Sequence, residues 1–416
     1  MREILLGCVA DDFTGASDAA SFLAQAGLPT VLLNEIPDAR ARIGEDACAV
    51  VIALKTRTIP AEEAVRQSMA AFHYLDRLGA KKLYFKYCST FDSTDKGNIG
   101  PVVDALLQTY KEKYTVICPS LPANGRVVKG GKLYVNGVLL QDSHMKDHPL
   151  TPMRESRIAA LMGAQGKYAS LEIGAQELCD ENTIKKIDAK ATEWKKPFYV
   201  IPDYYEDLHG AQIVKLFAAC RVYTGGSGLA GALGSFLYAK QPPSADKAML
   251  AGVNGKGIVL AGSCSAITLK QIDAFKQKGF PYYALSPEKL LAGEECAQTI
   301  WEKVKDHQHE VLIYSSEAPE KISKAQGAAA KIEATLSALA HKALQGGYTR
   351  FVVAGGETSG AVTKALGFRS FYIGESVATG VPIMTPAESL NLRIVLKSGN
   401  FGQIDFFERA LKMISL

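Results

Sequence analysis

The sequence lacks the features that would place it in several large classes of protein. Its eight cysteines, spread over 416 residues, include no Cys-x-x-Cys pair, which argues against a zinc site or a disulfide framework and favours the cytoplasm. No apolar run reaches the length of a membrane span. The apolar stretch near the N-terminus is followed by two acids, so we predict a strand there and no signal peptide. Because the net charge is only +4 without a basic run, we expect no nucleic-acid partner, and because no membrane span is present we expect no membrane partner.

Several signatures of nucleotide, metal and covalent chemistry are missing too. No segment matches GxxxxGK[ST], and neither half has GxGxxG after its first strand with an acid about 20 residues later, which disfavours an NAD-dependent oxidoreductase. The spacing of His144 and His148 suits zinc only on a helix, and Pro149 argues against a helix there, so we assign no residue to a metal. Cys88 and Cys264 have no evident base nearby in the sequence, which disfavours covalent catalysis.

Short apolar runs, many of them β-branched, alternate with amphipathic stretches along the chain. Runs of this kind without a clean polar alternation are typical of parallel strands buried on both faces. Helical patterns such as residues 61–78 and 266–278 lie between them, so the sequence predicts an α/β fold. The expected strands are 4–10, 49–54, 82–86, 115–118, 198–201, 222–224, 258–261, 282–285, 311–314, 351–354, 371–373 and 394–396.

One irregular segment divides the chain. Residues 241–256 contain Pro242, Pro243 and Gly252 and follow no period, which predicts a linker between domains 1–240 and 257–416. We predict a mostly parallel sheet with flanking helices in each domain. Within the first domain, Asn-Gly between the apolar-rich arms of residues 131–140 predicts a β-hairpin, which could be a lid, a subunit contact or a surface excursion.

The strand ends of the first domain are polar, and ligands of open parallel sheets bind at the carboxyl ends of strands. Asp11 and Asp12 follow the first strand, where they could hold a substrate hydroxyl and take its proton. The alternative is that they cap the next helix, which explains one of them better than both. Cations at three later strand ends could hold a carboxylate, although any one alone is typical of solvated surface charge; they are Lys55, Arg57, Lys86 and Arg126.

The strand ends of the second domain are rich in glycine instead. Glycine lets backbone amides approach a phosphate, and a helix N-terminus favours negative charge. One such loop would be weak evidence because tight turns also need glycine. Together, the loops at 261–265, 354–360 and 397–402 indicate a nucleotide site. Residues 225–228 of the first domain, Gly-Gly-Ser-Gly, lack the full dinucleotide pattern.

Five motifs in this order resemble the four-carbon acid sugar kinase family: residues 10–18 (ADDFTGASD), 86–94 (KYCSTFDST), 225–228, 262–265 and 354–360. The resemblance extends to residues 397–402 and so covers nearly the whole chain. Residues 91–94, 97–101 and 148–152 are most similar to the 3-oxo-tetronate kinases, which use ATP to phosphorylate the terminal O4. Ser17 and Val127 stand where the family usually has threonine, and these departures bear on the exact substrate.

The resemblance implies that residues 1–240 hold the acid sugar and residues 257–416 hold ATP with Mg²⁺, with the active site in a cleft between them. It assigns substrate positions to Asp11 or Asp12 and to Arg57, Lys86, Tyr87, Cys88 and Ser89, and the loop positions add Asp92 and Arg126. Because the two acids stand at a strand end, we expect Asp12 or its neighbour Asp11 to be the catalytic base. The implied nucleotide positions are Ser263, Gly355, Gly356, Glu357, Thr358 and Gly399.

The sequence therefore predicts a kinase that phosphorylates O4 of a four-carbon acid sugar, above all a 3-oxo-tetronate. Two alternatives stay open: a kinase for another acid sugar such as a threonate or erythronate, and a non-catalytic two-domain sensor of an anionic metabolite. The expected partners are the acid sugar and ATP, and the sequence leaves homo-oligomerisation open.

Overall fold

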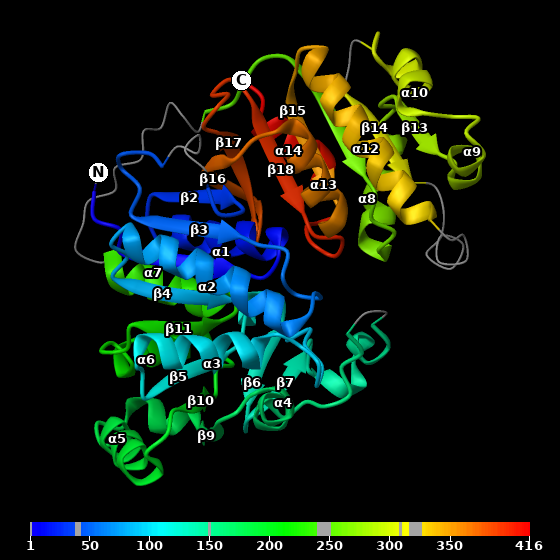
Figure 1. Ribbon diagram of the computed structural model, residues 1–416. Coiled ribbons are helices and arrows are strands. Elements are labelled where there is room, and N and C mark those ends of the chain that lie inside the picture. The colour runs from blue at the N-terminus through cyan, green and yellow to red at the C-terminus, as the bar shows by residue number, and fades with distance from the viewer. Residues whose placement is uncertain (1, 38–42, 149–150, 239–250, 308–309, 316–326) are drawn as a thin grey trace. The chain divides into compact units, whose positions relative to one another are not determined.

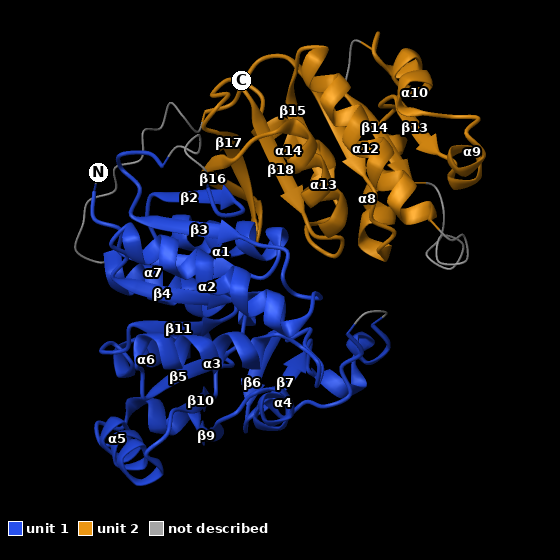
Figure 2. Cartoon of the chain, viewed as in Figure 1, with its two compact units in different colours: residues 1–39, 43–245 blue, residues 40–42, 246–416 orange. Residues whose placement is uncertain are grey.

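The computed structural model describes residues 2–37, 43–148, 151–238, 251–307, 310–315 and 327–416 (Figure 1). The chain divides into two compact units, of which unit 1 comprises residues 1–39 and 43–245 and unit 2 comprises residues 40–42 and 246–416 (Figure 2). Residues 241–250 of the predicted linker lie outside the described residues. The predicted domain boundaries stay predictions.

Unit 1 is built on a parallel sheet with strand order β2-β3-β1-β4-β11-β5-β10-β9. Strand β1 pairs with both β3 and β4, so Ala10 stands beside Ala53 and Lys86 in the ladder. Because these strands run in one direction, their carboxyl ends and the polar loops that follow share one edge. The strands are β1 (Leu6–Ala10), β2 (Thr30–Asn34), β3 (Ala49–Ala53), β4 (Lys82–Lys86), β5 (Tyr114–Cys118), β9 (Ala169–Ile173), β10 (Phe198–Pro202) and β11 (Val222–Gly225).

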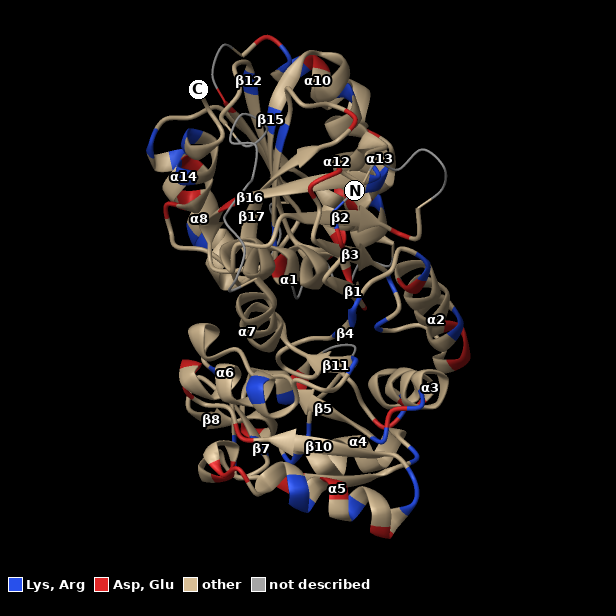
Figure 3. Ribbon diagram, turned by 90° about the vertical axis from the view of Figure 1, so that its left-hand side faces the viewer, with Lys and Arg blue, Asp and Glu red and all other residues tan. Residues whose placement is uncertain are grey.

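Helices cover both faces of this sheet. Figure 3 shows its strands between α1 and α7 on one side and α2 and α3 on the other, and within these pairs the helices pack against each other. The helices are α1 (Phe13–Gln25), α2 (Ala61–Arg77), α3 (Ile99–Tyr110), α4 (Ile158–Gln165), α5 (Thr183–Trp194), α6 (Asp207–Leu216) and α7 (Ser227–Tyr238), with 3₁₀ turns η1 (Pro122–Asn124), η2 (Leu140–Asp142), η3 (His144–Asp147) and η4 (Ala175–Cys179).

The predicted hairpin is present in unit 1. Strands β7 (Lys132–Val135) and β8 (Val138–Leu139) pair in antiparallel fashion around Asn136 and Gly137, whose φ angles are 51° and 82°. Positive φ at both central residues is what a tight two-residue hairpin turn requires. Strand β6 (Arg126–Lys129) pairs with β7, so the hairpin belongs to a separate three-stranded sheet that begins at Arg126.

Unit 2 has strand order β13-β14-β12-β15-β18-β17-β16. Its pairs are parallel except those of β17, which runs antiparallel to both β16 and β18. A buried cluster that includes Val259, Phe275, Val352, Val395 and Phe407 joins the sheet to α8 and α14. The strands are β12 (Lys256–Ala261), β13 (Tyr282–Leu285), β14 (Val311–Ser315), β15 (Tyr348–Ala354), β16 (Ser370–Ala378), β17 (Val381–Pro386) and β18 (Arg393–Lys397). The helices are α8 (Ala266–Gln277), α9 (Pro287–Ala292), α10 (Ala297–Val304), α12 (Ala328–Gln345), α13 (Gly356–Leu366) and α14 (Phe406–Met413).

The α/β class with a mostly parallel sheet in each unit is therefore confirmed. Every expected strand is present, and the helical patterns at 61–78 and 266–278 correspond to α2 and α8. Among the described helices, none combines the length and the apolar character that crossing a bilayer would require.

Candidate active site

An ion cluster of Arg57 with three aspartates stands at the carboxyl edge of the unit 1 sheet. Arg57 grips Asp11 with its planar fork, since Nε lies 3.0 Å from Oδ2 and Nη2 lies 2.7 Å from Oδ1. The same Nη2 donates to Oδ1 of Asp12 at 2.7 Å, and Nη1 lies 3.7 Å from Oδ2 of Asp92. The Asp11 side chain is 6% exposed and that of Asp12 is 26% exposed. Asp12 is therefore the acid that a substrate can reach more easily.

The two neighbouring aspartates differ in their electrostatics. Asp12 caps α1, because its Oδ1 accepts from the Gly15 amide at 3.0 Å and its Oδ2 accepts from the Thr14 hydroxyl at 2.8 Å. Burial alone would raise the pKa of Asp12, but Arg57, Lys86 and these hydrogen bonds together lower it. Burial raises the pKa of Asp11 even though Arg57 opposes the rise. The capping interpretation thus holds for Asp12, and it does not conflict with a role as base.

A buried asparagine that the sequence did not single out holds the Arg57 loop. Asn98, which precedes α3, donates through Nδ2 to the carbonyl oxygens of Thr56 at 2.6 Å and Ile59 at 2.9 Å. The amides of Thr56 and Arg57 donate to the Asp11 carbonyl at 2.9 and 3.2 Å. Because hydrogen bonds hold the loop on both sides of Arg57, the backbone that carries the Arg57 side chain has a fixed position.

A second buried polar cluster surrounds Lys86, the last residue of β4. Its Nζ donates to the Tyr87 carbonyl at 2.9 Å and lies 3.9 Å from Oδ2 of Asp18, which also accepts from the Ser227 hydroxyl. Burial raises the pKa of Asp18 to about 6, with Lys86 opposing the rise. Within the described part of the chain, Oδ1 of Asp18 and Nε of Arg126 are buried and have no hydrogen-bond partner. Such unpaired groups are costly unless a ligand completes them.

The predicted stretch from Tyr87 to Ser89 runs from the core toward the surface, with Tyr87 buried and Cys88 and Ser89 half-buried. Tyr87 is fully buried, with its hydroxyl 3.2 Å from that of Thr224, so its ring belongs to the core. The Cys88 sulfur lies 3.0 Å from the Thr90 hydroxyl, and burial raises the pKa of this thiol to about 12. The protonated thiol is a poor nucleophile. Ser89 is half-buried in the same loop.

The Asp92 backbone is held in an unusual conformation. Phe91 and Asp92 have φ angles of 67° and 45°, a region that residues other than glycine rarely adopt. Two hydrogen bonds stabilise this turn, from the Asp92 amide to the Thr90 carbonyl at 2.8 Å and from the Thr90 hydroxyl to Oδ1 of Asp92 at 2.8 Å. Strain of this kind persists where the surrounding structure fixes it, and here the result is a carboxylate that faces Arg57.

The glycines at 225–228 have a packing explanation. A Cβ atom at Gly225, Gly226 or Gly228 would lie 2.3, 2.4 or 2.8 Å from the carbonyl oxygens of residues 118, 119 or 120. Glycine is therefore needed because the loops after β5 and β11 approach each other closely. The segment positions Ser227 against Asp18, whose Oδ2 accepts from the Ser227 hydroxyl.

The three glycine-rich loops of unit 2 meet at one edge, because β12, β15 and β18 are neighbours in the sheet. The amides of Gly262 and Ser263 donate to the Ala354 carbonyl at 3.0 and 3.2 Å, and the Gly355 amide donates to the Lys397 carbonyl at 2.9 Å. A Cβ atom at Gly399 would lie 2.4 Å from Oγ of Ser263. The structure thus brings together loops that are more than 130 positions apart in the sequence.

Two helices of ordinary length begin at this edge. Ser265 caps α8 with its hydroxyl, whereas Gly355, at the N-cap of α13 with a φ of 123°, offers no side chain. The first amides of α13 therefore lack a side-chain acceptor, which suits an anionic ligand. In the first turn of α13, Glu357 is exposed and Thr358 is buried.

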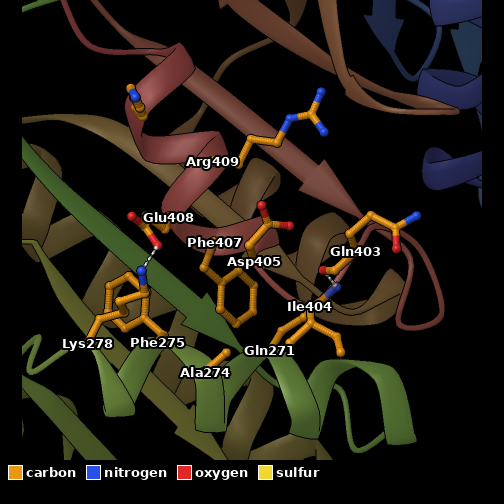
Figure 4. Close-up of a pocket in the computed structure, with 11 residues that line it drawn as sticks. Gln271, Ala274, Phe275, Lys278, Gln403, Ile404, Asp405, Phe407, Glu408 and Arg409 are labelled. Carbon is orange, nitrogen blue, oxygen red and sulfur yellow. Dashed lines mark hydrogen bonds and ion pairs between the residues drawn. The ribbon is translucent and has the colours of Figure 1, made fainter.

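A cavity of about 640 Å³ lies elsewhere in unit 2, between α8 and α14 (Figure 4). Phe275, Phe407 and Ile404 provide apolar walls, and Lys278 forms an ion pair with Glu408 across it at 3.4 Å. None of the residues predicted from the sequence lines this cavity. Its chemistry is mixed, so we give it no role.

The two histidines lie at the ends of the short turn η3, with His144 as its first residue and His148 directly after it. Nδ1 of His148 contacts the Thr151 hydroxyl at 2.9 Å, and Pro149 and Leu150 of the motif at 148–152 lie outside the described residues. Within the described ranges, no group of three or more His, Cys, Asp or Glu side chains is arranged to hold a metal ion.

Comparison with known proteins agrees with these two edges. Residues 6–233 match the family model of a sugar-binding N-terminal domain, and residues 258–407 match that of a nucleotide-binding C-terminal domain. The 3-oxo-tetronate kinase of Pseudomonas savastanoi pv. phaseolicola is 40% identical, with 99% of this chain and 97% of that protein covered. The 3-oxo-tetronate kinase of Haemophilus influenzae is 39% identical, with 98% of this chain and all of that protein covered.

Solved structures extend the likeness to the fold. A Haemophilus influenzae protein has a TM-score of 0.80 at 38% identity, covering 98% of this chain and 100% of its own. A Salmonella typhimurium protein, provisionally named a tRNA synthase, has a TM-score of 0.86 at 39% identity, covering 97% of this chain and 98% of its own. The fold and the two edges define the class of proteins in which a sugar-binding domain precedes a nucleotide-binding domain. Within it, this chain belongs to the four-carbon acid sugar kinase family, and its relatives there include 3-oxo-tetronate kinases.

Proposed function

We propose that this protein transfers the γ-phosphate of ATP to the terminal O4 hydroxyl of a four-carbon acid sugar, namely a 3-oxo-tetronate, and releases the 4-phosphate and ADP. The observation that carries the proposal is the identity of about 40% with 3-oxo-tetronate kinases over nearly the whole chain. The two edges supply the chemistry. One offers carboxylates and cations for an acid sugar, and the other offers backbone amides for phosphates.

On the acceptor side, Asp12 is the proposed base. As the bond from O4 to the γ-phosphorus forms and the bond from that phosphorus to the β-phosphate oxygen breaks, the O4 proton passes to the Asp12 carboxylate. Arg57 keeps this carboxylate ionised and oriented, because its Nη2 bonds to Asp12 while its fork holds Asp11. A low pKa limits the strength of such a base, so its main contribution comes as the hydroxyl becomes more acidic in the transition state.

The carboxylate of the acid sugar is assigned to Lys86 and Arg126. Arg57 is a weaker candidate than its sequence position indicated, since two of its three nitrogens already bond to Asp11 and Asp12. Nζ of Lys86 carries three protons and donates one hydrogen bond, to the Tyr87 carbonyl, and Nε of Arg126 has no partner in the described residues. Asp18 would then accept from a substrate hydroxyl through its unpaired Oδ1.

On the donor side, the amides around Ser263, Gly355 and Gly399 would hold the phosphates of ATP. The exposed Glu357 in the first turn of α13 fits the role of a Mg²⁺ ligand, because this ion is usually held by one or two carboxylates together with substrate phosphates. When bound, Mg²⁺ would neutralise charge that develops on the transferred phosphoryl group. We also propose a cytoplasmic location, consistent with the eight free cysteines.

The test is release of ADP across a panel of acid sugars. We expect turnover with a 3-oxo-tetronate and a lower kcat/KM with threonate and erythronate. A higher kcat/KM with threonate or erythronate would reassign the substrate within the family. Tight binding of an acid sugar without ADP release from any member of the panel would overturn the kinase proposal and favour a sensor.

A further inference from the structure

A buried lysine lies directly beneath the glycine-rich loops of unit 2. Lys397 is the last residue of β18 and is 0% exposed. Its Nζ donates to the Thr268 hydroxyl at 2.9 Å and to the Gly399 carbonyl at 3.0 Å. The Lys397 carbonyl accepts from the Gly355 amide. One residue therefore touches two of the three loops and the first turn of α8.

The Gly399 carbonyl is the point on which this arrangement converges. It accepts from the hydroxyls of Ser265 at 2.6 Å and Thr268 at 2.8 Å as well as from Lys397. Three donors around one carbonyl oxygen fix the peptide between Gly399 and Asn400. A charged ammonium group makes stronger hydrogen bonds than a neutral amine, so protonation of Lys397 tightens its hold on Gly399 and on the contact of Gly399 with Ser263.

Among the residues that the structure describes, no acid forms an ion pair with Lys397. Strands β15 and β17 and the loop at 398–402 contain no acid beside it, and α14 presents the Phe406 ring, with its centroid 5.9 Å from Nζ. The acids on neighbouring helices, Asp273, Asp405 and Glu357, are exposed. Within the described ranges none of them forms an ion pair with Lys397. Burial lowers the pKa of Lys397 to about 7, so the free protein holds this proton weakly at neutral pH.

We propose that Lys397 is a positioning residue of the nucleotide site, and that it takes up a proton when the phosphates of a nucleotide reach the glycine-rich loops. The inference rests on the proposed function, which places phosphates at this edge. A nearby phosphate favours the charged ammonium group because opposite charges attract across a poorly solvated site. The protonated lysine then holds Gly399 in the position that binds the phosphate, which makes nucleotide binding and protonation cooperative.

The direction of the pH dependence follows from this linkage. Below about pH 7, Lys397 is mostly protonated with or without nucleotide, so binding takes up little or no proton at this residue and is not weakened by it. As the pH rises toward about 9, the free protein loses the proton and binding must recover it, so affinity falls by up to about tenfold per pH unit. A merely structural role for the lysine stem predicts neither proton uptake nor this slope.

Calorimetry of the full-length protein with ADP and Mg²⁺ in two buffers of different ionisation enthalpy measures the uptake directly. At about pH 8 the phosphates of ADP are already ionised, since the second phosphate pKa is about 6, so a proton taken up must enter the protein. We expect uptake approaching one proton per ADP at this pH and a smaller uptake at about pH 7, where Lys397 of the free protein is already about half protonated. ADP binding without uptake at about pH 8 would overturn the inference and leave the proposed function intact, whereas no ADP binding at any pH would overturn both.

The variant Lys397→Met tests whether Lys397 is the residue that takes up the proton. We expect the variant to bind ADP about tenfold to a hundredfold more weakly than the wild type at about pH 6.5, to take up no proton, and to approach the wild-type affinity at about pH 9. Lys364→Met, at an exposed lysine in the last turn of α13, should leave affinity and uptake unchanged. A Lys397→Met protein that retains the wild-type proton uptake would refute the assignment. If this variant does not fold, the wild-type measurement still decides.

Discussion

The carboxyl edges of the two sheets differ in the chemical groups that line them. At the unit 1 edge, charged side chains carry the arrangement, with Arg57 holding Asp11 and Asp12 at 2.7–3.0 Å and facing Asp92. At the unit 2 edge, backbone groups and small hydroxyls carry it, and the one buried charge that we identify among the described residues is Lys397 beneath the loops. A proton acceptor must be a side chain, whereas phosphate can be held by amides. The contrast therefore matches a division between acceptor and donor sites.

The difference also says which changes each edge should tolerate. Ion clusters respond to the loss of a charge even when shape is kept, because the remaining partners are left buried and unpaired. Glycine-rich edges respond to added volume even when charge is kept. The loops lie so close together that an added Cβ atom would overlap with a neighbouring loop. Charge-removing isosteres should therefore damage acceptor chemistry in unit 1, and a single added methyl group should damage nucleotide binding in unit 2.

The largest expected effect is that of Asp12→Asn. Asparagine keeps the shape and the ability to cap α1 but loses the charge, so kcat should fall by about 10²–10⁴ while ADP binding persists. Steady-state kinetics and a melting curve measure the two properties separately. If both Asp12→Asn and Asp11→Asn keep more than about a third of the wild-type kcat, well short of that range, the base lies elsewhere and Asp92 is the next candidate. The capping role alone would change stability by roughly 0.5–2 kcal/mol on truncation to alanine and leave turnover near normal.

Asp18→Asn should remove one source of the pH dependence of the free energy of unfolding. The folded pKa of Asp18 is about 6, above the value of about 3.9 for an unfolded aspartate. Between these values the folded state binds more protons than the unfolded state, so this group's contribution to the free energy of unfolding falls as the pH rises. Asparagine has no such titration. The difference in unfolding free energy, variant minus wild type, should therefore increase by about 2–3 kcal/mol between about pH 4 and about pH 6.5.

Urea unfolding at several pH values in that window measures this difference. Asp95→Asn, at an exposed acid in the loop before α3, is the matched control and should show a nearly constant difference. A constant difference for Asp18→Asn as well would mean that Lys86 and Ser227 fully compensate the buried carboxylate, and that Asp18 is an ordinary structural acid.

Arg126→Gln tests the assignment of the substrate carboxylate. Loss of one charge-assisted contact should cost about 1.5–3 kcal/mol and raise the KM for the acid sugar about tenfold to a hundredfold, with the KM for ATP unchanged. Lys129→Gln on the same strand β6 removes an exposed cation and should leave both KM values unchanged. If Arg126→Gln raises the KM for ATP and leaves that for the sugar untouched, the contrast between the edges is reversed.

Strand prediction from the sequence depended on buried apolar runs. Such runs revealed the central strands, whereas β9 (ASLEI) is mostly half-buried or exposed at the sheet edge and β17 (VPIMTP) carries two prolines, so neither has that signal. Strand β2 (TVLLN) does have an apolar run and was missed although the signal existed. Polar strand ends indicated where the two sites would lie, because parallel strands end at one edge.

The partners within each site could not be predicted in the same way. That Arg57 grips Asp11 depends on the register of β1 beside β3, and that Gly399 meets Ser263 depends on β12, β15 and β18 being neighbours. Asp18 lies inside a helix, Asn98 precedes one, and Lys397 ends a strand as many lysines do. Their roles arise from burial and from the carbonyls and carboxylates that the fold brings to them, which no local pattern encodes.

The smallest expected effect is that of Gly399→Ala, which adds volume but no charge at the predicted nucleotide site. Gly399 does not adopt a positive φ, so alanine there strains no backbone, but its Cβ would lie 2.4 Å from Oγ of Ser263. The Ser263 hydroxyl can turn away, so Gly399→Ala should fold normally and bind ADP roughly tenfold more weakly, as a modest overpacking cost implies. Gly360→Ala on α13, where an added Cβ meets nothing within 4 Å, should leave ADP affinity unchanged and raise the stability of the helix by about 1 kcal/mol. Calorimetric titration of both variants compares them directly. Equal ADP affinity in the two would mean that the contact between Gly399 and Ser263 is packing only, and that the phosphates are held by the first turn of α13 without the loop after β18.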